Sequence, residues 1–484
     1  MVSRLCVLLL GVVLASCKVD AGDVTLKVVK SWQPAQDPFL DAKTIRVRVD
    51  GPSLLVGPTE FPVKNGSGTL EQVPVGDDRR ITVEGLGFEG NPISRGRTGP
   101  LTVPEGDLSI SLFVGLIDKD AGAFSYTPVK QLITPRAFHT ATLLSDGSVM
   151  VCGGISRPWR PERNESLPTP TTSMERIDGN SLLVQVASKS GCAPGTMGCM
   201  VSPRVGHTAM LLASGNVLVA GGTDGATLLD RVEIYSPEDN RFVRDAALKP
   251  RQWQMAVSVG NGALLVGGEN TAGMNLPSEL YTQGQVDVRP ALRRGRRAFT
   301  LTALPDGTLV AAGGIDASGQ LLDTIEILPP DAPSWSDTTR MEVPRAYHTA
   351  TLLEDGTILF VGGLHSDAAV VESSIERLDP PHKTITTLSI HLSKGERWGH
   401  SATQLDDGRV LVVGGFTGNR FGEPSSTVEQ ISFFDGGAAQ VRLLGNLKEA
   451  RAGHSTTLLR SGMVLVLGGV SGAQVSQTAE IFVY

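Results

Sequence analysis

The stretch PRAFHTATLLSDG at residues 135–147 returns almost unchanged as PRAYHTATLLEDG at residues 344–356. Each copy precedes an aliphatic run that ends in Gly-Gly, and a Glu follows further on. Seven units of about 50 residues carry all three marks, so the second part of the chain is a repeat array. The Arg stands at positions 136, 204, 251, 296, 345, 397 and 451, the Gly-Gly at 153–154, 221–222, 267–268, 313–314, 362–363, 414–415 and 468–469, and the Glu at 175, 233, 279, 326, 376, 429 and 480.

Each unit is expected to form four short strands, labelled a to d. Strand a follows the Arg, and a turn such as Asp-Gly leads into strand b, the Val/Leu/Ile run before Gly-Gly. That run is apolar throughout, so strand b should be buried on both faces. Strand c surrounds the recurrent Glu, as in residues 231–235, and a less regular strand d leads to the next Arg.

A period near 50 with Gly-Gly after a strand resembles the kelch repeat. The resemblance covers residues 122–484 and implies a seven-bladed β-propeller of four-stranded blades. The last unit stops at Tyr484, after its strand c. Residues 123–129 lie where a strand d would lie, so we expect them to close the ring by pairing with the last unit.

Composition excludes several other classes of protein. The 484 residues include 56 Gly and 29 Pro, a density typical of many turns and few long helices. A hydrophobic fraction of 40% argues against disorder. The net charge of −7 argues against electrostatic capture of nucleic acid. We therefore expect an all-β protein that does not bind nucleic acid, and we expect a monomer.

Residues 1–16 have the features of an export signal. One cation, Arg4, precedes the apolar run 5–15, which is too short to span a bilayer. Residues 14–17, Leu-Ala-Ser-Cys, resemble the bacterial lipobox, which implies that Cys17 is lipidated and begins the mature protein. The expected location is the bacterial cell envelope, at the outer membrane, through the lipid anchor alone. The alternative is an ordinary signal peptide with an incidental Cys.

Residues 17–121 lack the repeat. Alternating segments such as 44–49 and 108–114, separated by Gly, Pro, Asn and Asp, predict a small β-sandwich of Ig-like architecture. The Cys…Trp…Cys spacing of immunoglobulin domains is absent. A spacer between the membrane and the propeller is the expected role of this domain.

Residues that recur in every unit are expected to be structural. The repeated Arg and Glu should pair, which would compensate two buried charges. Five of the eight histidines share one repeat position, which is Gln254 and Phe299 in the other two units. A Phe at that position indicates packing and hydrogen bonding, with metal binding as the lesser alternative. Cys192 and Cys199 flank a turn-prone loop and should form a disulfide, whereas Cys152 should be a buried thiol.

Residues that occur once are the functional candidates. The b–c and d–a loops should share one face, and the b–c loops differ between units, as expected of a binding surface on a constant scaffold. Trp and Arg often anchor interfaces. Residues 293–297 carry extra arginines that could form an anion site, although a solvated charge cluster is the alternative. The candidate ligand-binding residues are Arg157, Trp159, Arg160, Trp253, Arg293, Arg294, Arg297, His365, Trp398, Asn419, Arg420 and Phe421.

The sequence favours a binding scaffold for a protein or glycan of the envelope or its surroundings, with no cofactor, no metal and no catalytic residues. The alternative is a carbohydrate-active enzyme, either a copper radical oxidase of galactose oxidase type or a sugar isomerase or lyase. Tyr347-His348 resembles the copper-ligand segment of galactose oxidase. That family also needs a Tyr cross-linked to a Cys, and no Tyr here has an evident Cys partner.

Overall fold

The computed structural model describes residues 21–29, 38–51, 54–62, 67–117, 125–129, 131–157, 168–186, 192–364, 374–393, 395, 397–417, 422–434 and 438–483. Over these residues the secondary structure is entirely strand, turn and loop, with no helix. This all-β composition agrees with the prediction from turn density and repeat pattern.

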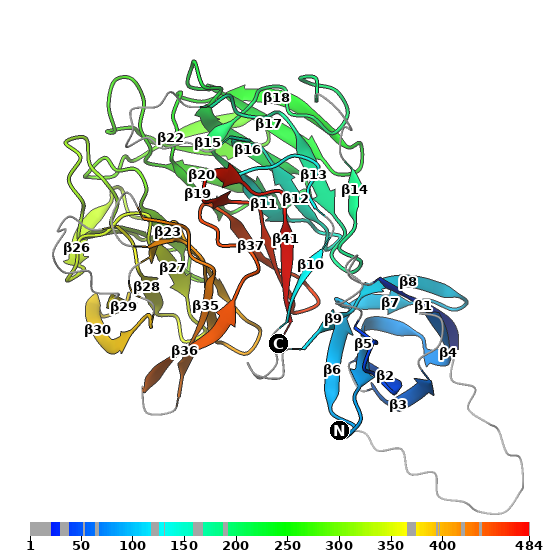
Figure 1. Ribbon diagram of the computed structural model, residues 1–484. Coiled ribbons are helices and arrows are strands. Elements are labelled where there is room, and N and C mark those ends of the chain that lie inside the picture. The colour runs from blue at the N-terminus through cyan, green and yellow to red at the C-terminus, as the bar shows by residue number, and fades with distance from the viewer. Residues whose placement is uncertain are drawn as a thin grey trace, which may run out of the picture.

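Seven four-stranded antiparallel sheets coincide with the seven repeat units (Figure 1). The first three are β11 (Thr140–Leu143), β12 (Val149–Cys152), β13 (Met174–Ile177) and β14 (Val184–Val186); β15 (Val205–Leu211), β16 (Val217–Thr223), β17 (Arg231–Ser236) and β18 (Arg241–Ala247); and β19 (Met255–Val259), β20 (Gly262–Val266), β21 (Ser278–Thr282) and β22 (Gln285–Arg289).

The next three sheets are β23 (Thr300–Ala303), β24 (Leu309–Ala312), β25 (Thr324–Leu328) and β26 (Ser336–Arg340); β27 (Thr349–Leu352), β28 (Ile358–Val361), β29 (Ser374–Asp379) and β30 (Thr384–His391); and β32 (Ser401–Gln404), β33 (Val410–Val413), β35 (Thr427–Phe433) and β36 (Ala439–Asn446). Two short ribbons pair β31 (Arg397–Trp398) with β34 (Phe416–Thr417), and β39 (Val470–Ser471) with β40 (Gln474–Val475).

The seventh sheet joins the two ends of the repeat array. It contains β37 (Ser455–Leu458), β38 (Val464–Leu467), β41 (Ala479–Val483) and, as its fourth strand, β10 (Ser125–Val129). Strand β10 runs antiparallel to β41, with Ser125 opposite Val483 and Val129 opposite Ala479. The predicted pairing of the segment before the first Arg with the last unit is therefore confirmed.

The first strands of the seven sheets form a closed circuit. Each contacts the first strand of the next sheet, and β37 contacts β11. The second strands, such as β12, β24 and β38, are buried along their whole length, as predicted from their apolar runs. Side chains from neighbouring sheets share each hydrophobic cluster, so the core lies between the sheets.

Residues 21–117 form two further sheets around one hydrophobic cluster. The cluster includes Val24, Val47, Ile81 and Leu112. The Phe113 amide of this region donates to the Asn180 carbonyl of the repeat array at 2.8 Å, and Phe113 packs with residues of the first and last sheets. The strands are β1 (Ala21–Val29), β4 (Ser67–Pro74) and β8 (Leu108–Phe113) in one sheet, and β2 (Thr44–Gly51), β3 (Leu54–Pro62), β5 (Gly76–Leu86), β6 (Pro92–Arg97), β7 (Leu101–Val103) and β9 (Gly115–Leu116) in the other.

Candidate functional site

The recurrent Arg and Glu pair within every repeat unit, as predicted. In the first unit Arg136 Nη2 lies 2.7 Å from Glu175 Oε1, and neither side chain is exposed. Arg136 Nη1 also donates to the Gly153 carbonyl, and Glu175 accepts the backbone N–H groups of Ile133 and Thr134. The pair therefore ties the d–a loop, the Gly-Gly segment and strand c together, which compensates both buried charges. The other pairs are Arg204–Glu233, Arg251–Glu279, Arg296–Glu326, Arg345–Glu376, Arg397–Glu429 and Arg451–Glu480.

The five repeated histidines connect neighbouring sheets. His207 Nε2 lies 3.0 Å from Thr140 Oγ1 on the preceding first strand, and Gln254 donates instead to the Ala220 carbonyl at 2.8 Å. The corresponding pairs are His139–Ser455, His348–Thr300, His400–Thr349 and His454–Ser401. These contacts agree with the prediction that the position serves packing and hydrogen bonding.

Burial keeps these imidazoles neutral. Desolvation, followed by the nearby repeat arginines, lowers the pKa of His139, His207 and His400 to about 3. The same causes lower the pKa of His348 and His454 well below the ordinary value. At neutral pH the five histidines thus carry no charge. Within the described residues, no group of three His, Cys, Asp or Glu side chains could hold a metal ion.

A cavity of about 1370 Å³ lies where the seven first strands begin. All seven units contribute the residue two positions after the Arg, so the cavity is coaxial with the ring of sheets. We call it the axial cavity. These seven residues are Phe138, Gly206, Trp253, Ala298, Tyr347, Gly399 and Gly453.

Each of these seven residues has a left-handed backbone. The φ angles are 55° at Phe138, 57° at Trp253 and 55° at Tyr347, and 60° to 66° at the three glycines. Their main-chain groups bond to one another around the cavity. Trp253 N donates to Gly206 O at 2.9 Å and Tyr347 N donates to Ala298 O at 2.9 Å. The constant part of the rim is thus a main-chain scaffold, and the variable part is its side chains.

Two further positions of the repeat contribute side chains to the rim in some of the units. The residue after the Arg forms a backbone bridge to the residue after Gly-Gly, as in Gln252 with Glu269 and Trp398 with Phe416. The third and fourth units place polar side chains here, and the sixth places two aromatic ones. Arg297 Nε lies 2.9 Å from Glu269 Oε2, and Gln252 Nε2 donates to Glu269 Oε1 at 3.1 Å. The axial cavity is therefore asymmetric, although the scaffold repeats.

Three of the predicted ligand-binding residues line the axial cavity: Trp253, Arg297 and Trp398. Arg157 is exposed outside the cavity. Arg293 and Arg294 are also exposed and do not line it, and their backbone N–H groups bond to Glu326. The structure does not bring the extra arginines to one anion site, because Arg297 pairs with Glu269. The predicted residues Cys17, Trp159, Arg160, His365, Asn419, Arg420 and Phe421 lie outside the described residues.

The cavity residues that sequence reasoning missed include Phe138, Gln252, Glu269, Tyr347 and Phe416. Tyr347 was considered only through the resemblance of Tyr347-His348 to a copper-ligand segment. An alignment of the seven units could have identified the two variable positions, because the residue after the Arg and the residue after Gly-Gly differ from unit to unit. No pattern in one unit alone reveals that these positions meet at an axis.

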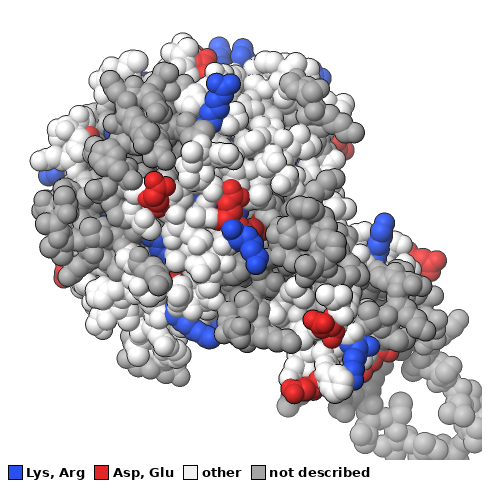
Figure 2. Space-filling view, viewed as in Figure 1, with Lys and Arg blue, Asp and Glu red and all other residues white. Residues whose placement is uncertain are grey.

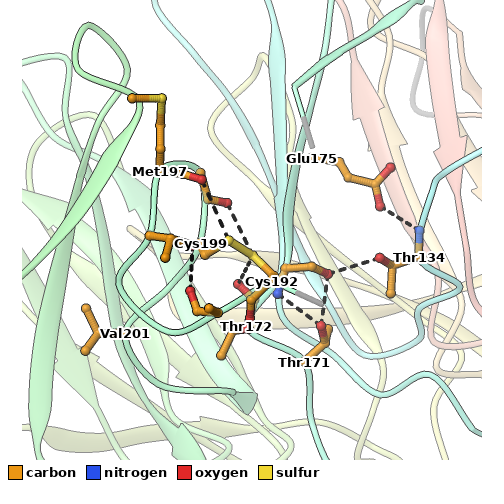
Figure 3. The surroundings of a disulfide bond; sticks show 12 residues. Thr134, Thr171, Thr172, Glu175, Cys192, Met197, Cys199 and Val201 are labelled. Atoms are coloured by element: carbon orange, nitrogen blue, oxygen red, sulfur yellow. Dashed lines mark hydrogen bonds between the residues drawn. A yellow bond between two sulfur atoms is a disulfide. The ribbon is translucent and has the colours of Figure 1, made fainter. Parts of the chain in front are cut away.

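The three described cysteines are a disulfide-bonded pair and one buried free thiol. Cys192 and Cys199 form a disulfide with a Cα–Cα distance of 5.7 Å, and Thr172 Oγ1 donates to the Cys192 carbonyl (Figure 3). Cys152 is a free buried thiol, and burial raises its pKa to about 11. Its sulfur contacts Thr140 and His207, and Tyr235 shares its hydrophobic cluster, but the Tyr235 hydroxyl donates to Asn240 Oδ1 at 2.9 Å. His348 bonds to Thr300, so Tyr347-His348 does not reproduce a copper-ligand segment paired with a Cys–Tyr group.

Charge on the surface is mixed. On the face shown in Figure 2, the described Lys and Arg residues are interspersed with Asp and Glu. Across the described part of the chain, no helix is long and apolar enough to cross a membrane.

Comparisons with known proteins agree with the repeat pattern. Residues 204–247 match the family described as Kelch motif. Adagio-like protein 3 of Oryza sativa subsp. japonica is 26% identical over 253 residues, which is 45% of this chain and 39% of that protein. Alpha-scruin of Limulus polyphemus is 26% identical over 292 residues, which is 55% of this chain and 29% of that protein. Adagio protein 3 of Arabidopsis thaliana is 32% identical over 177 residues, 33% of this chain and 28% of that protein.

This chain spans less than two fifths of the length of these relatives. The solved structure of YjhT is 12% identical, with a TM-score of 0.45, and the match covers 60% of this chain and 97% of that one. The motif match and the relatives support a kelch-repeat family for the repeat array, with a propeller-like all-β fold.

Proposed function

We propose that this chain is an exported, lipid-anchored binding scaffold, a seven-bladed kelch-type β-propeller that recognises a protein or glycan. The observation that supports binding is the asymmetric axial cavity. A purely structural rim could repeat the same side chains seven times, yet Gln252, Glu269, Arg297 and Trp398 each occur at one place only. Variable side chains on a constant main-chain rim are how a repeat scaffold presents a recognition surface.

An enzyme of galactose oxidase type is not favoured. Among the described residues, the sulfur of Cys152 contacts Thr140 and His207, and the hydroxyl of neighbouring Tyr235 bonds to Asn240. The cavity histidines are committed to hydrogen bonds between sheets. An isomerase or lyase would need an acid–base pair set apart from the repeats. Glu269 is the single carboxylate among the described cavity residues, and it is held by Arg297 and Gln252.

Affinity capture tests the binding function. The full chain would be immobilised and exposed to envelope and culture extracts beside a Trp253→Ala/Trp398→Ala variant. A control variant, Val288→Ser, alters an exposed residue on the outer strand β22. We expect a discrete protein or glycan to be retained by the native and control proteins and to be lost from the cavity variant. Equal retention by all three proteins, or no retention by any, would contradict the proposal.

We further propose that residues 1–16 direct export, that Cys17 is lipidated at the outer membrane, and that residues 17–121 form an Ig-like β-sandwich spacer before the propeller at 122–484. The support is the apolar run 5–15 before Cys17 and the two sheets that share one cluster in residues 21–117. Metabolic labelling with palmitate would test the anchor. Label should enter the native protein and be absent from a Cys17→Ser variant, whereas equal labelling would argue against it.

A further inference from the structure

The charge in the axial cavity is balanced. Among the described residues that line it, Arg297 is the single cation and Glu269 the single carboxylate, and the two are paired at 2.9 Å. The five lining histidines are neutral because burial lowers the pKa of each of them. An acidic peptide, a phosphate group or an acidic sugar would therefore find no unpaired cation to bind.

Five of the seven main-chain amides at the rim position two residues after the Arg are also occupied. The amides of Phe138, Trp253, Tyr347, Gly399 and Gly453 each donate to a carbonyl of the preceding unit. They cannot form an anion-binding nest, nor can they add an extended peptide as a further strand. At these five positions a ligand must therefore be recognised by side chains.

Those side chains include several flat apolar faces. The ring centroids of Tyr347 and Trp398 are 5.6 Å apart, and those of Trp398 and Phe416 are 4.5 Å apart. Phe138 and Trp253 form a second pair at 6.4 Å. All five rings line the cavity and all are half-buried, so part of each remains accessible. Five such rings gather at one cavity although aromatic residues make up only 5% of the chain.

Backbone strain gives independent support. Phe138, Trp253 and Tyr347 hold a left-handed conformation that three other units assign to glycine. A bulky residue in this conformation costs on the order of 1 kcal/mol or more, and such strain concentrates at ligand sites. Bulky rings are therefore placed at the rim at a cost in stability that glycine would avoid.

We propose that the axial cavity binds a neutral oligosaccharide, with pyranose rings stacked on the Trp398 and Trp253 faces and hydroxyl groups bonded to Glu269, Arg297 and Gln252. The apolar C–H face of a pyranose matches an aromatic ring, and its hydroxyls both donate and accept. One hydroxyl can thus bridge a carboxylate acceptor and a guanidinium donor. The cavity of about 1370 Å³ exceeds the roughly 300–1,000 Å³ of a single small-ligand pocket, so it suits several linked sugars. This inference rests on the proposed binding function and names its ligand class.

The test is direct binding of the full chain to an array of neutral hexose and N-acetylhexosamine oligosaccharides. Oligogalacturonates and a peptide library serve as comparators. A neutral oligosaccharide should bind and change the tryptophan fluorescence, because Trp253 and Trp398 line the cavity. The affinity should be nearly independent of the NaCl concentration between 50 and 500 mM, because the ligand is neutral and forms no ion pair with the cavity.

Variants locate the site. Trp398→Ala should weaken binding at least tenfold, and Glu269→Gln should weaken it severalfold. Trp398→Phe should retain most of it, which separates the loss of an aromatic face from misfolding. The Arg293→Ala/Arg294→Ala control, outside the cavity, should bind like the native protein. Preferential binding of oligogalacturonates or peptides, equal binding by Trp398→Ala, or binding of no oligosaccharide would overturn the inference. If Trp398→Ala binds equally or no oligosaccharide binds, the affinity capture still tests the binding function separately. That function would stand if the native protein retains a protein that the Trp253→Ala/Trp398→Ala variant does not.

Discussion

The imidazole of His400 packs against the α-carbon of Gly362 in the preceding repeat unit. A Cβ on Gly362 would lie 2.8 Å from His400 Cε1 and 2.5 Å from the Arg397 carbonyl oxygen, and the φ angle of Gly362 is 60°. The same contact joins Gly153 to His207 and Gly414 to His454. The first glycine of each Gly-Gly pair is therefore required by the neighbouring unit, and the repeat pattern records contacts between sheets as well as within them.

Gly362→Ala should destabilise the protein strongly, by about 3 kcal/mol or more, because a Cβ would clash and the backbone would be strained. Gly356 in the same unit is a matched control, since its φ is 83° and no atom lies within 4 Å of its Cβ position. Gly356→Ala should cost only about 1 kcal/mol, from strain alone. Urea unfolding of both variants measures the difference, and equal losses would contradict a packing requirement at Gly362.

Removing one partner of a buried ion pair should be costly. Arg204 and Glu233 are fully buried, and Arg204 also donates to the Gly221 carbonyl at 2.8 Å. Arg204→Met leaves Glu233 without its counter-charge, so we expect a loss of about 3–5 kcal/mol. The exposed Arg340–Asp323 pair is the control, and Arg340→Met should cost under about 1 kcal/mol. Equilibrium unfolding measures the free energy of unfolding of both variants. A loss under about 1 kcal/mol for Arg204→Met would show that Glu233 can remain buried without a counter-charge.

The buried histidines should make the protein sensitive to mild acid. Burial and Arg397 lower the pKa of His400 to about 3 in the folded state, against an ordinary value of 6.5. Above pH 6.5 both states hold a neutral imidazole. As the pH falls from 6.5 towards 3, the unfolded chain takes up a proton that the folded chain does not, so stability is lost. The free energy of unfolding should decrease by up to about 1.4 kcal/mol per pH unit for each such histidine.

The substitution His400→Gln removes one of these buried imidazoles and so measures its contribution to the pH dependence. Glutamine fits the position, because Gln254 occupies it in the third unit and donates to the Ala220 carbonyl. The variant should lose about 2 kcal/mol less stability than the native protein between pH 7 and pH 5. His382→Gln, at an exposed turn, removes no buried imidazole and should follow the native protein. Urea titrations at the two pH values provide the measurement, and an unchanged pH dependence in His400→Gln would refute the assignment.

The sequence predicted the scaffold well because the scaffold repeats. The Arg–Glu pairs, the buried second strands and the pairing of residues 125–129 with the last unit all followed from seven copies of one pattern. The axial cavity was only partly predicted. Trp253 and Trp398 were singled out by residue type, but Glu269 and Gln252 belong to positions whose meeting depends on the closed ring. Arg297 was assigned to an anion site because its partner Glu269 is 28 residues away in sequence and could not be inferred locally.

Substitutions of Tyr347 test whether its left-handed backbone strain is retained for ligand binding. Tyr347→Gly relieves the left-handed strain, as Gly206, Gly399 and Gly453 do in other units, but it removes the ring that packs on Trp398. These effects oppose each other, so the free energy of unfolding should change by less than about 1 kcal/mol. Oligosaccharide binding should fall at least tenfold, because one aromatic face and the hydroxyl near Arg297 Nη1 are lost. Tyr347→Phe keeps the ring and should bind within about threefold of the native protein. A large loss of stability in Tyr347→Gly with unchanged binding would show instead that the ring serves the scaffold alone.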